Sequence, residues 1–228
     1  MRAIVFLDGE PRFQPYPFAP PLEGPVRRAV DDAAGVLART SRRFDGPVAF
    51  CHGVARDGAI LRRKGRYAEA MVVFEEPTLA YRLGFALGVQ LFVERPEGAT
   101  LFQLRGPSIG RDPLLWTASA SGGLRPGQEP REAILADAAE EIGLGEDDLL
   151  GFGPVAVVTS DDTGSALVVY GASLREGAEP EPDPVKVAEL AWVRDPEELG
   201  AQVSADALAA WDAVARRRAE RAEEQEAV

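Results

Sequence analysis

The stretch SGGLRPGQEPREAILADAAEEIGL, residues 121–144, decides the fold. Its first eight residues contain three glycines and a proline, which predicts a loop with special backbone angles. The remainder is rich in Ala, Glu and Leu, and it predicts a helix that begins near Pro130 and stops at Gly143. Four apolar residues of this helix have the spacing of a core-facing side: Ala133, Ile134, Ala138 and Ile142.

Three carboxylates gather near the end of this predicted helix. Asp137, Glu140 and Glu141 have the spacing i, i+3, i+4, so they share one helix face and lie within ligand reach of each other. Like charges that close repel on a bare helix, whereas a hard divalent cation removes the repulsion and prefers oxygen ligands. The group is therefore either a solvated helix face or a metal site, and the glycine-flanked loop favours the metal site.

The stretch resembles the Nudix box of the Nudix hydrolases, which has the form Gly, five residues, Glu, seven residues, then Arg-Glu-apolar-any-Glu-Glu-any-Gly-apolar. Gly122 takes the first glycine, and the Glu-Glu-any-Gly-apolar end falls on Glu140, Glu141, Gly143 and Leu144. Three positions depart from the pattern while the spacing stays intact: Gln128 replaces the first Glu, Ala136 the Arg, and Asp137 the next Glu.

The resemblance implies an α/β fold, a Nudix-like mixed sheet between helices, over about residues 84–200. It also implies a hydrolase in which Mg²⁺ or Mn²⁺, held by Asp137, Glu140 and Glu141, helps water to cleave a diphosphate linkage. Nucleotide sugars and ADP-ribose-like compounds are the expected substrates, because an added subdomain often shapes a pocket for the second moiety. Five residues are expected to contact this small nucleotide-type substrate: Arg105, Trp116, Gly122, Gly123 and Gln128. Trp116 is as well suited to core packing as to stacking on a base.

The composition narrows the class of protein. The chain has 228 residues, enough for one large domain or two small ones, and 46% of them are apolar. The formal charge of −12 argues against a nucleic-acid backbone as the main partner. The single cysteine, Cys51, allows no internal disulfide, and no apolar run has the length of a signal peptide or a membrane span. We therefore expect a cytoplasmic protein that binds neither nucleic acid nor membrane.

The residue pattern changes near residue 85 and predicts two parts: a small N-terminal α+β subdomain, residues 1–83, and a Nudix-like domain with a C-terminal helix, residues 84–228. In the first part we predict a buried strand, a helix, a hairpin that turns at Asp57-Gly58, a further strand and a short helix or connector, at residues 3–7, 25–43, 48–63, 69–76 and 77–85. In the second part we predict strands at residues 86–94, 100–106, 153–160, 165–174 and 185–193.

The C-terminal helix is predicted at residues 204–225, with Ser204 as its N-cap. Its apolar residues Leu208, Trp211, Val214 and Ala215 have helical spacing, which suits either packing on the chain's own sheet or a homodimer seam.

Two alternatives to a hydrolase remain. One is a nucleotide-binding or regulatory module that lost turnover through Ala136 and Gln128, and the other is a protein-interaction partner that uses the C-terminal helix. A nucleophile pair of Cys51 and His52 is disfavoured, because neighbouring residues on a strand point to opposite faces.

Overall fold

The computed structural model of the chain describes residues 2–18, 21–39, 45–55 and 58–226. The strands are β1 (Arg2–Phe6), β2 (Phe13–Pro15), β3 (Pro47–Val54), β4 (Ile60–Arg66), β5 (Phe85–Glu94), β6 (Thr100–Arg105), β7 (Trp116–Thr117), β8 (Ala120–Gly123), β9 (Leu149–Ser160), β10 (Ser165–Leu174) and β11 (Val187–Val193). The α-helices are α1 (Gly24–Arg39), α2 (Tyr67–Glu75), α3 (Ala80–Leu83), α4 (Pro130–Ile142) and α5 (Ala205–Glu226), and the short 3₁₀ helices are η1 (Pro77–Leu79), η2 (Glu146–Asp148) and η3 (Pro196–Gln202).

The strands form one mixed, curled sheet. Its main path runs β1-β9-β10-β5-β3-β4-β2, with β10 parallel to β5 and antiparallel to β9. The short strand β8 also pairs with β5, while β6 pairs with β11, with β7 and with the end of β5. Strand β5 is thus the centre of the sheet, and the sequence after β8 leads directly into α4.

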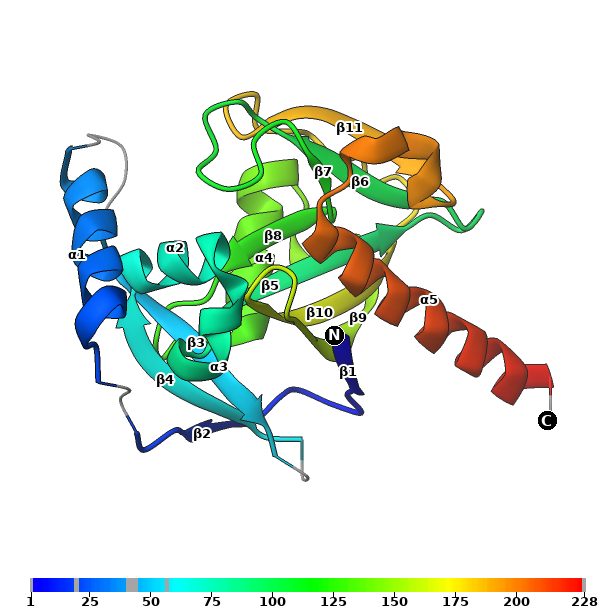
Figure 1. The fold of residues 1–228 in the computed structure, drawn as a ribbon. Coiled ribbons are helices and arrows are strands. Elements are labelled where there is room, and N and C mark those ends of the chain that lie inside the picture. Colours follow the sequence, from blue (N-terminus) through cyan, green and yellow to red (C-terminus); the bar gives the residue numbers. More distant parts are fainter. Residues whose placement is uncertain (1, 19–20, 40–44, 56–57, 227–228) are drawn as a thin grey trace.

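Side-chain alternation along β5 divides the core between the two faces of the sheet. Val89, Leu91 and Val93 pack in the cluster that contains the apolar residues of α4. Phe92 points to the other face and packs in the cluster that contains the apolar residues of α5. Figure 1 shows α4 and α5 on opposite sides of the central strands, with α5 extending beyond the sheet at its C-terminal end.

A third cluster joins the N-terminal helices to the sheet. Val30 and Leu37 of α1 pack with α2 residues and with Phe50 of β3, and the four-residue helix α3 adds Leu83. Figure 1 shows α1, α2 and α3 gathered around β3 and β4. Helix α2 therefore lies beside the start of β5, next to the glycine-rich strand β8.

Most predicted elements are confirmed. The five predicted strands from residue 86 onward correspond to β5, β6, β9, β10 and β11, and the central and C-terminal helices to α4 and α5. Ser204 caps α5, because its Oγ accepts a hydrogen bond from Ala207 N at 3.2 Å. The hairpin is formed by β3 and β4, with Gly58 in a left-handed conformation (φ +78°); Asp57 and residues 40–43 of the predicted first helix lie outside the described residues.

Two predictions in the N-terminal part are wrong. Residues 69–76, predicted as a strand, lie mostly in α2, whose apolar run is buried and whose start is capped by a hydrogen bond from Arg66 N to Glu69 Oε1 at 2.9 Å. A short apolar run has no clear period, so its helical state depends on such tertiary contacts. The strand predicted at residues 3–7 is present as β1, but its predicted burial is wrong: among the described residues β1 is an edge strand that pairs with β9, and Val5 remains 36% exposed.

A third correction concerns the glycine-rich loop. Residues 121–123 belong to β8 and pair with β5, with Gly122 opposite Val89 and Gly123 opposite Gly88. Only the segment after Gly123 is a loop. Backbone pairing overrides the low strand propensity of glycine here, because β5 offers a free edge at this point.

Sheet pairing crosses the predicted boundary between residues 1–83 and 84–228. Strand β1 pairs with β9, and β3 pairs with β5. Leu7, Ala49 and Cys51 share a core cluster with residues of β5 and α4. Whether residues 1–83 fold as a separate unit stays a prediction.

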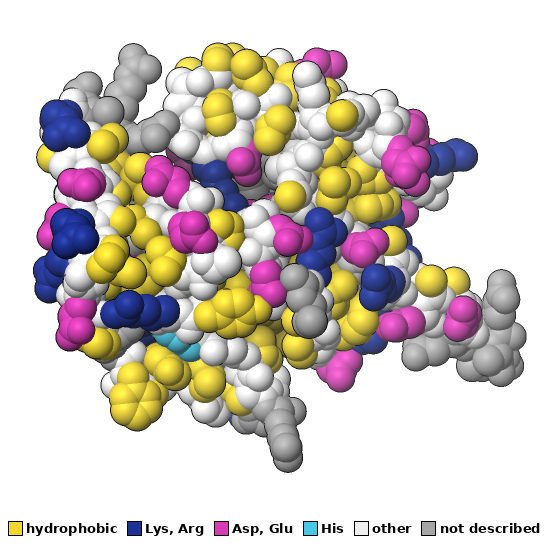
Figure 2. Space-filling view, viewed as in Figure 1, with side chains coloured by type: hydrophobic (Ala, Val, Ile, Leu, Met, Phe, Trp, Pro, Cys, Tyr) yellow, Lys and Arg dark blue, Asp and Glu magenta, His cyan; other side chains and the backbone are white. Residues whose placement is uncertain are grey.

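The surface carries both signs of charge. Figure 2 shows acidic and basic side chains interspersed over one face of the molecule, so this face offers no continuous basic surface to a nucleic-acid backbone. Within the described ranges, the helices all lack the length or the apolar character needed to cross a membrane.

Candidate active site

Helix α4 presents the predicted carboxylates to strand β8. Pro130 occupies its first turn, and Gly143 ends it in a left-handed conformation (φ +68°), as the sequence predicts. Ala133, Ile134, Ala138 and Ile142 are buried in the core beneath the sheet. This packing fixes the rotation of the helix and hence the direction of its acidic side.

Glu141 is the most buried of the three carboxylates, at 9% exposure. Its Oε2 accepts hydrogen bonds from Gln103 Nε2 at 2.7 Å and from Ser121 N at 3.1 Å. Burial raises the pKa of Glu141, while these two hydrogen bonds act in the opposite direction. Glu141 therefore links Gln103 of β6 to Ser121 of β8.

Asp137 lies one helical turn earlier and packs against the next residue of β8. A Cβ atom built on Gly122 would lie 2.0 Å from Asp137 Oδ2, so a side chain at Gly122 would displace the carboxylate. Burial, followed by the negative charge of Glu141, raises the pKa of Asp137 to about 6. Asp137 and Glu141 are thus two neighbouring carboxylates held against consecutive residues of one strand.

Glu140 takes a different direction. Its side chain is 61% exposed, and its Oε1 pairs with Lys186 Nζ at 2.7 Å. Among the described residues, no three Asp, Glu, His or Cys side chains are arranged to hold a metal ion. The expected three-carboxylate cluster is therefore not assembled, because consecutive helix residues such as Glu140 and Glu141 point about 100° apart.

Gln128 stabilises the loop before α4. Its Oε1 accepts a hydrogen bond from Arg125 N at 3.2 Å, and the intervening Gly127 is left-handed (φ +85°). The amide oxygen of Gln128, a residue predicted to contact substrate, thus accepts a hydrogen bond within its own loop. Ala136, at the position of the box arginine, is exposed and offers no polar contact to the carboxylates.

Arg105 reaches the same region from the end of β6. Its Nη1 donates to Ser121 Oγ at 2.9 Å, while its Nε makes no hydrogen bond within the described part of the chain. Burial lowers the pKa of Arg105, and the nearby charge of Glu141 partly offsets this effect. The guanidinium group is therefore a partly buried cation near Glu141 and Asp137.

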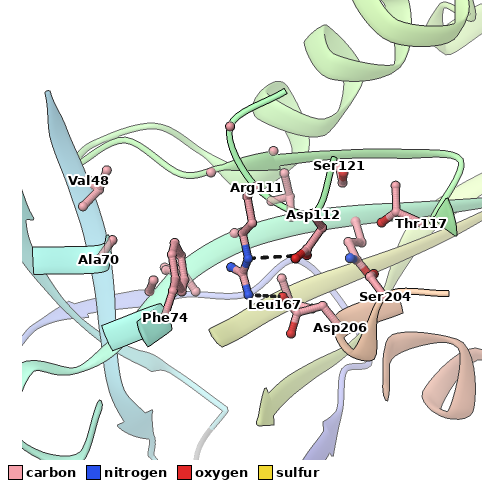
Figure 3. A pocket seen from close by; sticks show the side chains of 18 of the residues that line it. Val48, Ala70, Phe74, Arg111, Asp112, Thr117, Ser121, Leu167, Ser204 and Asp206 are labelled. Atoms are coloured by element: carbon pink, nitrogen blue, oxygen red, sulfur yellow. Dashed lines mark ion pairs between the residues drawn. The ribbon is translucent and has the colours of Figure 1, made fainter. Parts of the chain in front are cut away.

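A cavity of about 240 Å³ opens on the other side of β8. Arg105, Gly122 and Gly123 line it at the end near the carboxylates. Figure 3 shows Phe74 and Ala70 of α2 on one side and Ser121 and Thr117 on the other. The cavity thus lies between helix α2 and strand β8.

Arg111 closes one border of this cavity. Its Nη2 pairs with Asp206 Oδ2 at 2.7 Å and donates to Ser165 Oγ at 2.9 Å. Its guanidinium carbon lies 3.7 Å from the centre of the Phe74 ring, an arrangement that is visible in Figure 3. The loop between β6 and β7 is thereby tied to α2, β10 and α5.

Trp116 does not line the cavity. It is 8% exposed and packs with Phe102 and the apolar residues of α5 in the core cluster on the α5 side of the sheet. Of the two roles predicted for Trp116, core packing and stacking on a base, the structure shows core packing. Trp211 and Val214 of α5 likewise pack against the chain's own sheet, which is the alternative to a dimer seam.

The sequence prediction missed the cavity residues that come from distant segments, above all Gln90, Phe74, Arg111 and Asp206. One signal was present: Gln90 is the only uncharged polar side chain inside the apolar run 86–94.

The separation of Cys51 and His52 is as predicted, since Cys51 is fully buried with a pKa raised to about 11, and His52 stacks on Tyr16 at 4.0 Å.

No family model matches the sequence, and a comparison with curated proteins finds no relative. Among solved structures, DR0079 from Deinococcus radiodurans is similar with a TM-score of 0.53 and 20% identity, covering 71% of this chain and 94% of that one. RenU, a Nudix hydrolase from M. smegmatis, has a TM-score of 0.43 and 21% identity, covering 78% and 96%. The Ap4A hydrolase of C. elegans has a TM-score of 0.45 and 15% identity, covering 59% and 98%.

At such identities the likeness concerns the fold. The chain combines a curled mixed sheet between helices with a glycine-rich strand, a loop and an acidic helix at residues 122–144. The TM-score of 0.53 shows that the chain shares the fold of DR0079.

Proposed function

We propose that the protein is a divalent-metal-dependent hydrolase of a nucleoside diphosphate linked to another moiety. The observation that carries this proposal is the pair Asp137 and Glu141, held against consecutive residues of β8 beside a cavity that also contains a partly buried arginine. Nucleotide sugars and ADP-ribose-like compounds are the expected substrate class.

The donor atoms of the site suit Mg²⁺ or Mn²⁺. Both are hard cations that prefer carboxylate oxygens and keep several waters. Burial, followed by the negative charge of Glu141, raises the pKa of Asp137, and the positive charge of a bound cation would act in the opposite direction. Asp137 and Glu141 would hold the ion, and Glu140 would join them after leaving Lys186. When bound, such an ion polarises a diphosphate and increases the acidity of water.

The chain's own residues would position the substrate. Arg105 is a partly buried cation whose buried Nε has no hydrogen-bond partner among the described residues, so it would donate to a phosphate oxygen. Gly122 and Gly123 let a phosphate group approach the backbone of β8, because neither carries a side chain. In the reaction the oxygen of water joins one phosphorus and the bridging P–O bond breaks. Near neutral pH this gives two phosphate monoesters and two protons.

A nucleotide-binding module without turnover is the second candidate. It is favoured by the exposed Ala136, by the occupied amide oxygen of Gln128 and by the ion pair that holds Glu140 away from its neighbours. A complete Nudix box would carry Glu at position 128 and Arg at position 136, where this chain has Gln and Ala.

A substrate panel separates the two candidates. Release of nucleoside monophosphate from nucleotide sugars and dinucleotides is measured with and without Mn²⁺, for the parent and for Glu141→Gln. We expect metal-dependent release that falls by on the order of 100-fold in Glu141→Gln. The matched control is Glu132→Gln, an exposed residue of the same helix, which should retain the parent rate. Saturable nucleotide binding with no release from any compound would favour the module instead.

A further inference from the structure

Two buried polar atoms in the lining of the cavity lack a hydrogen-bond partner in the described part of the chain. They are Gln90 Oε1 and Arg105 Nε, and the Gln90 residue is only 3% exposed. A buried polar group without a partner destabilises a fold by about 1 to 3 kcal/mol. Keeping two of them in one cavity is therefore unfavourable unless a ligand supplies the missing partners.

The geometry brings these two residues to the same part of the cavity. Gln90 of β5 and Ser121 of β8 are direct cross-strand partners and point to the same side of the sheet. Arg105 Nη1 donates to that same Ser121 at 2.9 Å. Gly88, two residues before Gln90 on the same side of β5, also lines the cavity, and a Cβ atom there would lie 2.8 Å from Gly122 O, so β5 and β8 approach too closely at this point for a side chain.

The two atoms have complementary chemical roles. Arg105 Nε is a donor on a cation and matches a phosphate oxygen, whereas Gln90 Oε1 is a neutral acceptor and matches an N–H group. The wall across the cavity includes Tyr67 and Phe74 of α2, whose rings suit a planar group. At about 240 Å³ the cavity is smaller than the roughly 300 Å³ at the lower end of small-molecule sites, so it suits one ring system with its phosphate rather than a whole substrate.

We infer that Gln90 is a specificity-determining residue that accepts a hydrogen bond from an N–H group of the substrate's base. The inference rests on the proposed function, because it takes the ligand to be a nucleotide. It assigns the base to the cavity between α2 and β8, and so gives the N-terminal segment a role in substrate selection. The second moiety of the substrate then extends from the carboxylate end toward solvent.

Equilibrium binding tests this assignment without relying on turnover. Dissociation constants are measured by calorimetry in EDTA for AMP, GMP, CMP, UMP and ribose 5-phosphate, with the parent and with Gln90→Leu. We expect the parent to bind at least one nucleotide about 10-fold or more tightly than ribose 5-phosphate. Gln90→Leu should lose this preference and keep the affinity for ribose 5-phosphate. The matched control is Gln14→Leu, an exposed glutamine of β2, which should bind as the parent does.

A folding measurement separates a ligand-binding role from a structural one. Gln90→Leu removes a buried amide oxygen that has no hydrogen-bond partner among the described residues, so its thermal unfolding midpoint should equal or exceed that of the parent. An analogue of the preferred nucleotide that carries a methyl group on the base N–H should bind the parent as weakly as the unmodified nucleotide binds Gln90→Leu.

The outcomes distinguish this inference from the proposed function. Base-dependent binding that is lost in Gln90→Leu, with no turnover in Mn²⁺, would support the inference and overturn the hydrolase. Turnover in Mn²⁺ with no preference for a base, or with a preference that Gln90→Leu retains, would overturn the inference alone. Absence of both binding and turnover would overturn both.

Discussion

The absence of a side chain at Gly122 makes room for the Asp137 carboxylate. Residues 122 and 137 are distant in sequence, yet a Cβ atom at Gly122 would lie within 2.0 Å of Asp137 Oδ2. The first glycine of the box-like pattern is thus explained by close packing between β8 and α4. Its backbone adopts no left-handed conformation, so sterics alone require a glycine here.

The change Gly122→Ala should destabilise the protein. The added methyl group must push Asp137 away or move the strand, and such overpacking lowers the free energy of unfolding by about 1 to 3 kcal/mol. Gly123→Ala is the control, because nothing lies within 4 Å of its Cβ position. Urea unfolding should place Gly123→Ala within about 0.5 kcal/mol of the parent. Equal effects of the two changes would contradict the packing described for Asp137.

Asp137 itself should make stability depend on pH. Its pKa is raised from 3.8 to about 6 in the folded protein, so between these values the folded state binds more protons than the unfolded state. Stability therefore falls as pH rises through this window and stays low above it. In EDTA at about pH 8, Asp137→Asn should be more stable than the parent by about 2 to 3 kcal/mol, and near pH 4 the two should agree. Urea unfolding at both pH values checks this, and an equal difference at both would contradict it.

At the scale of elements, the loop between β6 and β7 depends on Arg111. Asp112 and Leu114 in this loop have positive φ angles of 49° and 59°, which non-glycine residues rarely adopt. The ion pair with Asp206, the hydrogen bond to Ser165 and the contact with Phe74 hold the loop in this conformation. One side chain thus sets the border of the cavity.

Removing the Arg111 side chain should lower the free energy of unfolding. In Arg111→Ala the Asp206 carboxylate, buried at 5% exposure, keeps only Thr163 and Ser165 as partners. We expect a loss of about 3 kcal/mol in the free energy of unfolding, measured by urea denaturation. Arg216→Ala removes an exposed ion pair with Asp212 and should cost less than about 1 kcal/mol. If the two variants lose equal stability, Arg111 does not anchor the loop.

Prediction from sequence succeeded for elements with a strong local signal. Helix α4 has helix formers, an N-terminal proline and a C-terminal glycine, and β5, β9 and β10 are long apolar runs. It failed for α2 and β8, whose states depend on partners. Buried Glu69 of α2 pairs with Arg63 at 2.7 Å, and β8 exists because β5 provides an edge. The local sequence indicates neither the ion pair of Glu69 nor the pairing of β8 with β5.

At the scale of the whole molecule, the cavity could not be predicted because its walls come from segments that lie far apart in the sequence. Tyr67 and Phe74 arise before the box-like stretch, Arg111 in a loop, and Asp206 in the last helix. The sequence located the carboxylates and Arg105 correctly in one region. It did not foresee that Glu140 turns toward Lys186, because helical spacing defines neighbours but not the partners of their side chains.

The central claim is that Asp137 and Glu141 together hold a divalent cation, and Mn²⁺ binding tests it most directly. Electron paramagnetic resonance of free Mn²⁺ gives the affinity of the parent, of the double variant Asp137→Asn/Glu141→Gln, and of the control Glu132→Gln. The account predicts saturable binding by the parent and the control, and a loss on the order of 100-fold in the double variant. Equal Mn²⁺ affinity for the parent and the double variant would contradict it.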